Sequence, residues 1–243
     1  MQIMKYLNLL FFAAMIVMNY LANALPLNGK TTGQVSDAYA NFFAPAGITF
    51  SIWGIIYILL LIFCVVQFTT SQQAVVSRIG WLFGLTCIFN ALWIAAWHYD
   101  RLPLSLILMA GLLVSLIWIN VFIKEMPYGF FKAAFGVYLG WICIATIANV
   151  TVLLVSQGWG GFGLSGETWA IIMIVVGAFL VALTVWRLDN PFIGMAVVWA
   201  FAGIMIKRSA DVRSVFIIAA VALVVVAAVL LLTFFRKQIT GLA

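Results

Sequence analysis

The stretch IGWLFGLTCIFNALWIAAWH, residues 79–98, decides the fold class of this chain. It has about the 20 residues that an α-helix needs to cross the hydrocarbon core of a bilayer, and no Asp, Glu, Lys or Arg interrupts it. Asn90, Trp93 and Trp97 recur in it at helical spacing, so they lie on one face. The stretch therefore predicts a membrane-spanning helix with one face turned toward other parts of the protein.

The rest of the chain has the same apolar character. Of its 243 residues, 67% are hydrophobic and 7% are charged, whereas about a quarter of a soluble domain is charged. No water-soluble fold could bury this much apolar surface, so we predict an all-α, polytopic integral membrane protein in contact with the lipid bilayer. About eight transmembrane helices are expected, over residues 6–25, 47–69, 79–98, 102–123, 130–156, 168–187, 191–207 and 213–235.

The first span has two interpretations. Lys5, the apolar run after it and Ala22-Asn23-Ala24 resemble a cleavable signal peptide. The apolar run continues to about Leu25, which is long for a signal core and adequate for a membrane span, so we expect residues 1–24 to be retained. With eight spans both termini lie on the same side. Seven basic residues on that side, against five on the other, favour the cytoplasmic face of a bacterial cell membrane.

Charged side chains are expected only in loops and at helix ends. All six acidic residues occupy such positions, and a coupled transporter usually keeps an ionisable group at membrane depth. Ion-coupled transport by a buried carboxylate is therefore disfavoured. The net charge is +6, but the basic residues are scattered through the loops. They indicate membrane topology and predict no nucleic-acid partner.

The cysteines and the histidine of the sequence do not form the pattern of a metal site or of a disulfide. Cys64, Cys87 and Cys143 fall inside apolar segments without a CxxC neighbour, and His98 is the single histidine. We predict no metal site and no disulfide. His98 is followed by Tyr99-Asp100-Arg101, which predicts that it lies in a hydrated loop.

Two other predicted spans carry a polar and aromatic stripe like that of residues 79–98. A helix that faces lipid needs only aliphatic side chains, so aromatic rings with polar tips on several helices indicate a shared interior that could hold a flat hydrophobic molecule. There are structural alternatives, because deep Trp also packs helices together and intramembrane Asn joins helices by hydrogen bonds of around 1 kcal/mol. The predicted ligand-binding residues are Trp53, Tyr57, Asn90, Trp93, Trp97, Tyr138, Trp141, Ala145 and Asn149; no catalytic residue is predicted.

Two connections are longer than the others. Residues 26–45 are polar and end in the aromatic side chains of Tyr39, Phe42 and Phe43. This loop is either a lid over the mouth of the helices or an ordinary connector. Residues 157–167, QGWGGFGLSGE, contain glycines that allow a tight reversal, and Trp159 and Phe162 suit the membrane interface.

Three of these motifs resemble the TspO/MBR family, the tryptophan-rich sensory or translocator proteins. They follow in the family's order and fall on the corresponding helices: Phe43-Ala44-Pro45 with Ile52-Trp53-Gly54-Ile55-Ile56-Tyr57, then Phe89-Asn90-Ala91-Leu92-Trp93, then Tyr138-Leu139-Gly140-Trp141 with Ala145 and Asn149. The resemblance covers roughly residues 6–156, which is the size of that family's fold. It implies a TspO-like five-helix core over residues 1–156 and a three-helix membrane extension over residues 157–243.

The resemblance also implies a function. TspO/MBR proteins bind porphyrins and sterols, form dimers and, in some bacterial members, break down protoporphyrin in light and oxygen. Trp53 and Trp141 match the tryptophan pair tied to this breakdown, and Asn90 and Tyr138 match pocket-lining positions. The resemblance thus implies a homodimer that binds a hydrophobic planar ligand, porphyrin-like or sterol-like, for sensing, handling or light-dependent breakdown, with no cofactor besides a porphyrin as ligand.

Two other functions remain open. The chain could be a transporter or permease-like protein for a lipophilic small molecule, because it has about eight spans and a long loop that could act as a lid. It could also be an intramembrane enzyme that acts on an isoprenoid or a tetrapyrrole. Such an enzyme would need acid–base groups at the pocket, and only His98 or Asp100 could supply them.

Overall fold

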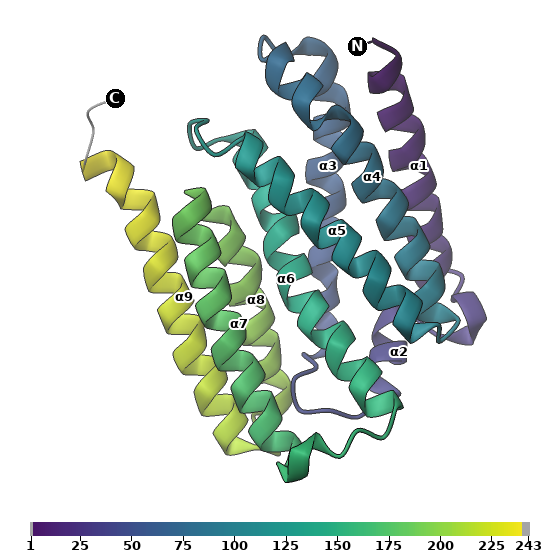
Figure 1. Ribbon diagram of the computed structural model, residues 1–243, viewed down its shortest axis with the longest axis vertical. Coiled ribbons are helices and arrows are strands. Elements are labelled where there is room, and N and C mark those ends of the chain that lie inside the picture. The colour runs from purple at the N-terminus through teal and green to yellow at the C-terminus, as the bar shows by residue number, and fades with distance from the viewer. Residues whose placement is uncertain (1, 240–243) are drawn as a thin grey trace.

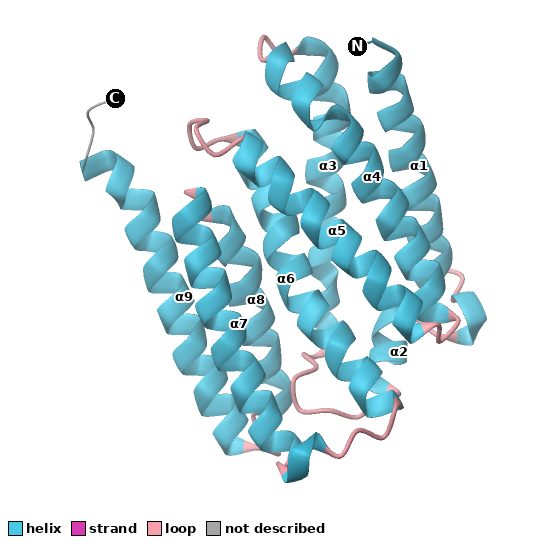
Figure 2. Ribbon diagram, in the orientation of Figure 1, coloured by secondary structure: helices cyan, strands magenta, loops and turns pink. Residues whose placement is uncertain are grey.

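The computed structural model describes residues 2–239, and these residues form long helices without any strand (Figures 1 and 2). Residue 1 of the predicted core and residues 240–243 of the predicted extension lie outside the described residues. The eight long helices of the described part are α1 (Gln2–Asn23), α3 (Ile52–Thr69), α4 (Gln73–His98), α5 (Leu102–Phe122), α6 (Phe130–Ser156), α7 (Gly166–Leu188), α8 (Phe192–Arg208) and α9 (Arg213–Ile239).

The predicted membrane class is confirmed. Seven helical segments of the described chain are long and apolar enough to cross a bilayer, with α3 and the preceding 3-10 turn Gly47–Ser51 forming one of them. The remaining predicted span, 191–207, corresponds to α8, which has only 17 residues. Outward-facing aliphatic side chains on α3 and α9, such as Ile58 and Val224, are more than half exposed and contact the bilayer.

The helices pack in two groups that meet at α6. In the first group α4 lies between α1 and α5, α5 packs on α6, and α3 packs against α1 and α6. In the second group α9 packs against both α7 and α8. The main contact between the groups is α6 with α8 (Figure 1). The start of α1 and the described end of α9 lie at the same end of the bundle (Figure 1); which side of the membrane this end faces stays a prediction.

A close backbone approach joins the two groups. A Cβ atom at Gly140 of α6 would overlap the carbonyl oxygen of Ile193 in α8, so only glycine fits there. One turn earlier, Gly136 packs against the amide of Asn190, which donates from Nδ2 to Asn120 Oδ1 at 2.8 Å and to the Lys132 carbonyl at 3.0 Å. Small residues allow helices in a membrane to pack this closely.

The first long connection is more ordered than a simple linker. It contains the 3-10 turn Leu27–Gly29 and the short helix α2 (Thr32–Asp37), which begins with a capping box between Thr31 and Gln34. The indole of Trp97 in α4 donates to the Thr32 carbonyl at 3.3 Å. This contact fixes α2 against the helix ends at the loop side of the bundle.

The prediction for His98 is wrong. His98 is fully buried, as the last residue of α4, and its Nδ1 lies 2.8 Å from the Ile94 carbonyl. Asn28, in the 3-10 turn Leu27–Gly29 at the start of the long connection, donates from Nδ2 to the His98 carbonyl at 2.9 Å. The first connection therefore folds over His98. The polar residues that follow His98 in the sequence, Tyr99, Asp100 and Arg101, did not indicate this burial.

Candidate functional site

Trp53 of α3 lies at the centre of an aromatic cluster, which we define as Trp53, Tyr57, Trp93, Trp97, Tyr138 and Trp141. The ring centroid of Trp53 is 5.5 Å from Tyr57, 6.1 Å from Trp93, 6.0 Å from Tyr138 and 6.1 Å from Trp141. The rings meet stacked, tilted or edge-on, which are the arrangements that aromatic pairs prefer. The stripes of three helices thus do meet in one interior, as the sequence indicated.

Three hydrogen-bond donors in the aromatic cluster are buried without a partner among the described residues: Tyr57 OH, Trp93 Nε1 and Trp141 Nε1. The Thr32 hydroxyl, which lines the same cavity as the two indoles, is also unpartnered. Leaving a buried donor unsatisfied costs about 1–3 kcal/mol, and most buried polar groups in folded proteins are hydrogen-bonded. Such a concentration at one place indicates a site that a further polar group could complete.

The two predicted asparagines have protein partners instead. Asn90 accepts from Asn19 Nδ2 at 2.7 Å and donates to Tyr138 OH at 3.1 Å. Asn149 exchanges hydrogen bonds of 3.1–3.2 Å with the Ser105 hydroxyl of α5. Both amides therefore join helices, which is the structural alternative that the sequence left open. Asn149 and Ala145 nevertheless line a cavity beside the aromatic cluster.

The cavity beside the aromatic cluster is small. Its volume is about 30 Å³, and Trp53, Trp93, Trp97 and Trp141 contribute to its wall. One water molecule needs roughly 10–15 Å³ measured in this way, whereas pockets for drug-sized ligands measure about 300–1,000 Å³. The rings are therefore packed closed, and a planar ligand could enter only if they move apart. The sequence did not identify the contribution of Thr32 and Ser36 to this wall.

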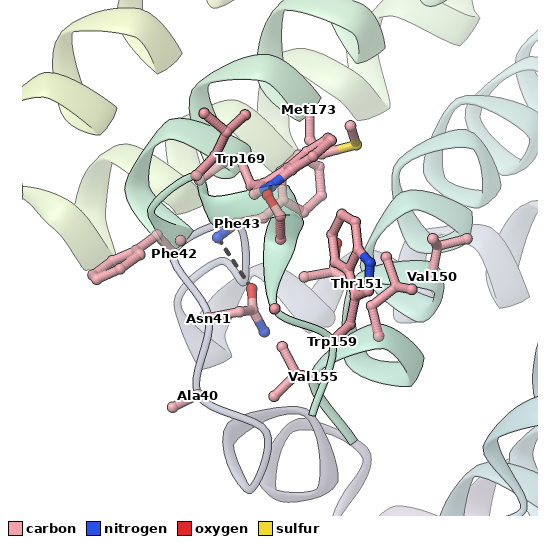
Figure 3. Close-up of a pocket in the computed structure, with 16 residues that line it drawn as sticks. Ala40, Asn41, Phe42, Phe43, Val150, Thr151, Val155, Trp159, Trp169 and Met173 are labelled. Carbon is pink, nitrogen blue, oxygen red and sulfur yellow. Dashed lines mark hydrogen bonds between the residues drawn. The ribbon is translucent and has the colours of Figure 1, made fainter. Parts of the chain in front are cut away.

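A larger pocket, which we call the loop pocket, lies at the end of α6 next to the two long connections (Figure 3). Its volume is about 380 Å³, within the usual range for small-molecule sites. Residues from the first connection, α6, the second connection and α7 line it, including Phe42, Val150, Trp159, Trp169 and Met173. The Trp159 and Trp169 ring centroids lie 5.0 Å apart, and the wall is mainly apolar.

The loop pocket is held in shape by one buried cation. Arg208 donates from Nε to the Phe42 carbonyl at 3.2 Å and from Nη2 to the Asn41 carbonyl at 2.7 Å, and it pairs with Asp211 at 2.6 Å. The guanidinium carbon lies 5.3 Å from the centroid of the Phe42 ring. Asn41 Oδ1 in turn accepts from the Phe43 amide at 3.0 Å (Figure 3). The first connection thus lines this pocket and packs on the helix ends.

The sequence singled out both connections but not the pocket that they form together. Trp159 was assigned to the membrane interface and Phe42 to a lid, because each segment was considered alone. Contact between residues 40–43 and residues 159–169 depends on how α6 and α7 are placed, which local sequence does not specify. Aromatic residues in both long connections were the one available signal.

The residues that an acid–base enzyme would need lie outside both cavities. His98 and Asp100 do not line the cavity of the aromatic cluster or the loop pocket. Asp100 accepts a hydrogen bond from Tyr39 OH at 3.0 Å; partial burial, and then this carboxylate, raise the pKa of Tyr39. The described residues also contain no group of three or more His, Cys, Asp or Glu side chains that could hold a metal.

Comparison with known proteins finds one family. The model of a family described as TSPO-like protein matches residues 5–234. The match includes α7, α8 and nearly all of α9, whereas the resemblance found in the sequence motifs covered residues 6–156. No curated protein and no solved structure matches the chain.

Proposed function

The chain belongs to the TSPO-like protein family, and from this premise we propose that it binds a hydrophobic, planar small molecule, such as a tetrapyrrole or a sterol-like compound, in the aromatic cluster. The observation that carries the proposal is the set of buried, unpartnered donors on Tyr57, Trp93 and Trp141 around the ring of Trp53. A flat ligand with acceptor atoms at its edge satisfies these donors while its face stacks on the rings.

Binding in the aromatic cluster requires an opened form of it. The cavity of about 30 Å³ admits a water molecule but not a ring system. Opening breaks contacts between the rings, each pair of which stabilises the closed form by about 0.5–1.5 kcal/mol. The bound ligand then forms its own contacts with the rings. A ligand that binds only the opened form shifts the population toward it. The role that follows is sensing or handling of the ligand, because binding would be coupled to the opening of the aromatic cluster.

The loop pocket is a second, mainly apolar volume close to the aromatic cluster. Ala148 and Asn149 of α6 line the cavity of the aromatic cluster, and the next two residues, Val150 and Thr151, line the loop pocket. A hydrophobic molecule from the bilayer or the loop side therefore meets an open pocket of about 380 Å³ near the closed cluster. The loop pocket is the competing location for the same ligand.

The test is a titration of the purified full chain with protoporphyrin, followed by the absorbance of the porphyrin so that loss of tryptophan emission does not confuse the reading. The double variant Trp53→Phe/Trp141→Phe is expected to bind about tenfold more weakly, which corresponds to about 1.4 kcal/mol. The matched control is Trp118→Phe/Trp186→Phe, because these two residues are 52% and 47% exposed and line neither the aromatic cluster nor the loop pocket. It is expected to bind like the unaltered protein.

Two outcomes would contradict the proposal. If Trp159→Phe/Trp169→Phe weakens binding and the Trp53/Trp141 variant does not, the ligand occupies the loop pocket and the site assignment is wrong. If protoporphyrin and a sterol both fail to bind saturably to the unaltered protein, binding of a planar hydrophobic ligand is wrong.

A further inference from the structure

A pocket at the opposite end of the bundle from the loop pocket contains a buried cation that has no acidic partner among residues 2–239. This lysine pocket has a volume of about 200 Å³ and lies between the first turns of α1 and of α4. It is lined by Met4, Lys5, Asn8, Val76, Ser77, Gly80 and Trp81. Neither the aromatic cluster nor the loop pocket shares a residue with it.

Lys5 is only 5% exposed. Its Nζ donates to Gln73 Oε1 at 2.6 Å and lies 5.7 Å from the centroid of the Phe68 ring, but it forms no ion pair with any described acidic side chain. An ammonium has three hydrogens to donate. A buried charge that lacks a counter-charge is costly, so an anion beside Lys5 would stabilise the fold.

The other buried basic side chains show what Lys5 lacks. Lys132 pairs with Asp189 at 3.3 Å, and Arg208 pairs with Asp211 at 2.6 Å. Both cations are therefore neutralised within the chain. Among the three, Lys5 alone has a neutral amide as the side-chain acceptor of its ammonium, and it lines a pocket of about 200 Å³, the size of a small headgroup.

An acceptor with no partner completes the lysine pocket. Asn8 is fully buried and donates from Nδ2 to Gln67 Oε1 at 3.1 Å, and Gln67 Nε2 donates to the Lys5 carbonyl at 3.1 Å. This arrangement fixes the Asn8 amide and leaves its Oδ1 unpartnered among the described residues. The pocket thus combines a cation that needs an anion with an oxygen that needs a hydroxyl or amine donor.

The surrounding residues place the pocket at the level of the lipid headgroups. Trp81, which lines the pocket, is 56% exposed, and Tyr6, which follows Lys5 in the chain, is 63% exposed. Trp and Tyr are enriched at the membrane–water interface. Basic pockets between membrane helices bind the headgroups of anionic lipids. We propose that the lysine pocket binds the phosphate of an anionic phospholipid whose headgroup carries a hydroxyl group, with Lys5 on the phosphate and Asn8 Oδ1 on the hydroxyl.

The test measures the thermal unfolding of the full chain in mixed micelles of an uncharged detergent and phosphatidylcholine, to which phosphatidylglycerol is added. The unaltered protein is expected to gain several degrees in Tm with a saturable dependence on the anionic lipid, and Lys5→Gln is expected to raise the lipid concentration for half-saturation at least tenfold. Arg78→Gln is the matched control, because it removes a positive charge from the same end of α4 at an exposed position outside the pocket. It is expected to keep the saturable gain.

A second variant distinguishes loss of lipid binding from a folding defect caused by Lys5→Gln. Ser77→Phe adds a ring at an exposed position of the pocket wall and leaves Lys5 in place; it is expected to abolish the gain by filling the space. Equal losses in Lys5→Gln and Arg78→Gln would overturn the proposal in favour of diffuse surface charge. An equal gain from inorganic phosphate alone would also overturn it, because the site would then bind a free anion and not a lipid.

Discussion

The side chains of Asn90 and Tyr138 are hydrogen-bonded at 3.1 Å between α4 and α6. Asn90 Oδ1 accepts at the same time from Asn19 of α1 at 2.7 Å, so one amide connects three helices. Asn90 and Tyr138 are both fully buried. Because Tyr138 belongs to the aromatic cluster, this connection fixes how α4 and α6 place their rings against Trp53.

A double-mutant cycle with Asn90→Leu and Tyr138→Phe measures this connection. We expect each single change to lower the free energy of unfolding, and the coupling energy to be about 0.6–1.7 kcal/mol, the range found for hydrogen bonds between membrane helices. Unfolding by detergent titration gives the values. A coupling energy of zero would mean that the two side chains do not interact in the membrane.

The close approach of α6 to α8 predicts that Gly140→Ala is strongly destabilising. In an open helix position the change from glycine to alanine adds about 0.5–1 kcal/mol of stability. At Gly140 the added Cβ overlaps the Ile193 carbonyl, and the forced separation of the helices should cost about 1–3 kcal/mol. Gly54→Ala is the control, because no atom lies within 4 Å of a Cβ there. Thermal unfolding should change in opposite directions for the two variants, and equal effects would contradict the contact.

Asp189 carries the ionic contacts between the ends of α6 and α9. Its carboxylate pairs with Lys132 at 3.3 Å and with Arg236 at 2.9 Å, and Tyr128 OH donates to it at 2.9 Å. Asp189→Asn keeps the shape and suits the left-handed backbone at φ 48°, but it removes the carboxylate that pairs with the fully buried Lys132. We expect a loss of about 3–5 kcal/mol in the free energy of unfolding.

The control for Asp189→Asn is Asp37→Asn, which breaks the ion pair of Asp37 with Lys207. Both of these side chains are partly exposed, so the change should cost no more than about 1 kcal/mol. Chemical unfolding of both variants in the same detergent makes the comparison. Similar small losses for both would show that Lys132 finds another partner.

The raised pKa of Tyr128 predicts how the free energy of unfolding depends on pH in alkaline solution. Partial burial, and then the hydrogen bond to Asp189, raise the pKa of Tyr128 above the usual value near 10. The folded protein therefore holds this proton more tightly than the unfolded chain. The stabilisation is fully present below about pH 10 and is lost as the pH rises further, because the unfolded chain then ionises first.

The measurement is Tm between pH 8 and pH 12 for the unaltered protein and for Tyr128→Phe. The variant should lose less stability over this range, since it has no phenol to ionise at this position. Tyr20→Phe, at an exposed position, should follow the unaltered curve. Parallel curves for Tyr128→Phe and the unaltered protein would remove Tyr128 as a source of the pH dependence.

The membrane helices were predictable from the sequence because bilayer thickness sets their length. The predicted spans 102–123 and 130–156 agree with α5 and α6 to within one residue. The start of α4 was missed by six residues, because Gln73, Ser77 and Arg78 interrupt the apolar pattern there and the helix extends beyond the apolar run. The burial of His98 was not predicted, because it depends on how residues 26–45 fold back over the end of α4. The residues next to His98 in the sequence do not specify this long-range contact.

The candidate site was predictable in part. Helical spacing brought the rings of α3, α4 and α6 into one interior, and the structure places them together. Whether that interior is open depends on packing between rings, so the sequence could not show a cavity of only about 30 Å³. The role of Asn149 as a partner of Ser105 could not be read from the sequence either, since it depends on the register of α5 against α6.

The 17 residues of α8 give it a length of about 26 Å, some 4 Å short of the hydrocarbon core of an average bilayer. Its side chains Met195 and Ile206 are about half exposed, so one face of α8 contacts lipid although the opposite face is buried against its neighbours. Acyl chains beside this helix must shorten or tilt to keep its ends in the headgroup region, which costs a fraction of a kcal/mol per Å of mismatch. The protein should consequently thin the bilayer on its α8 side and favour membranes built from shorter lipids.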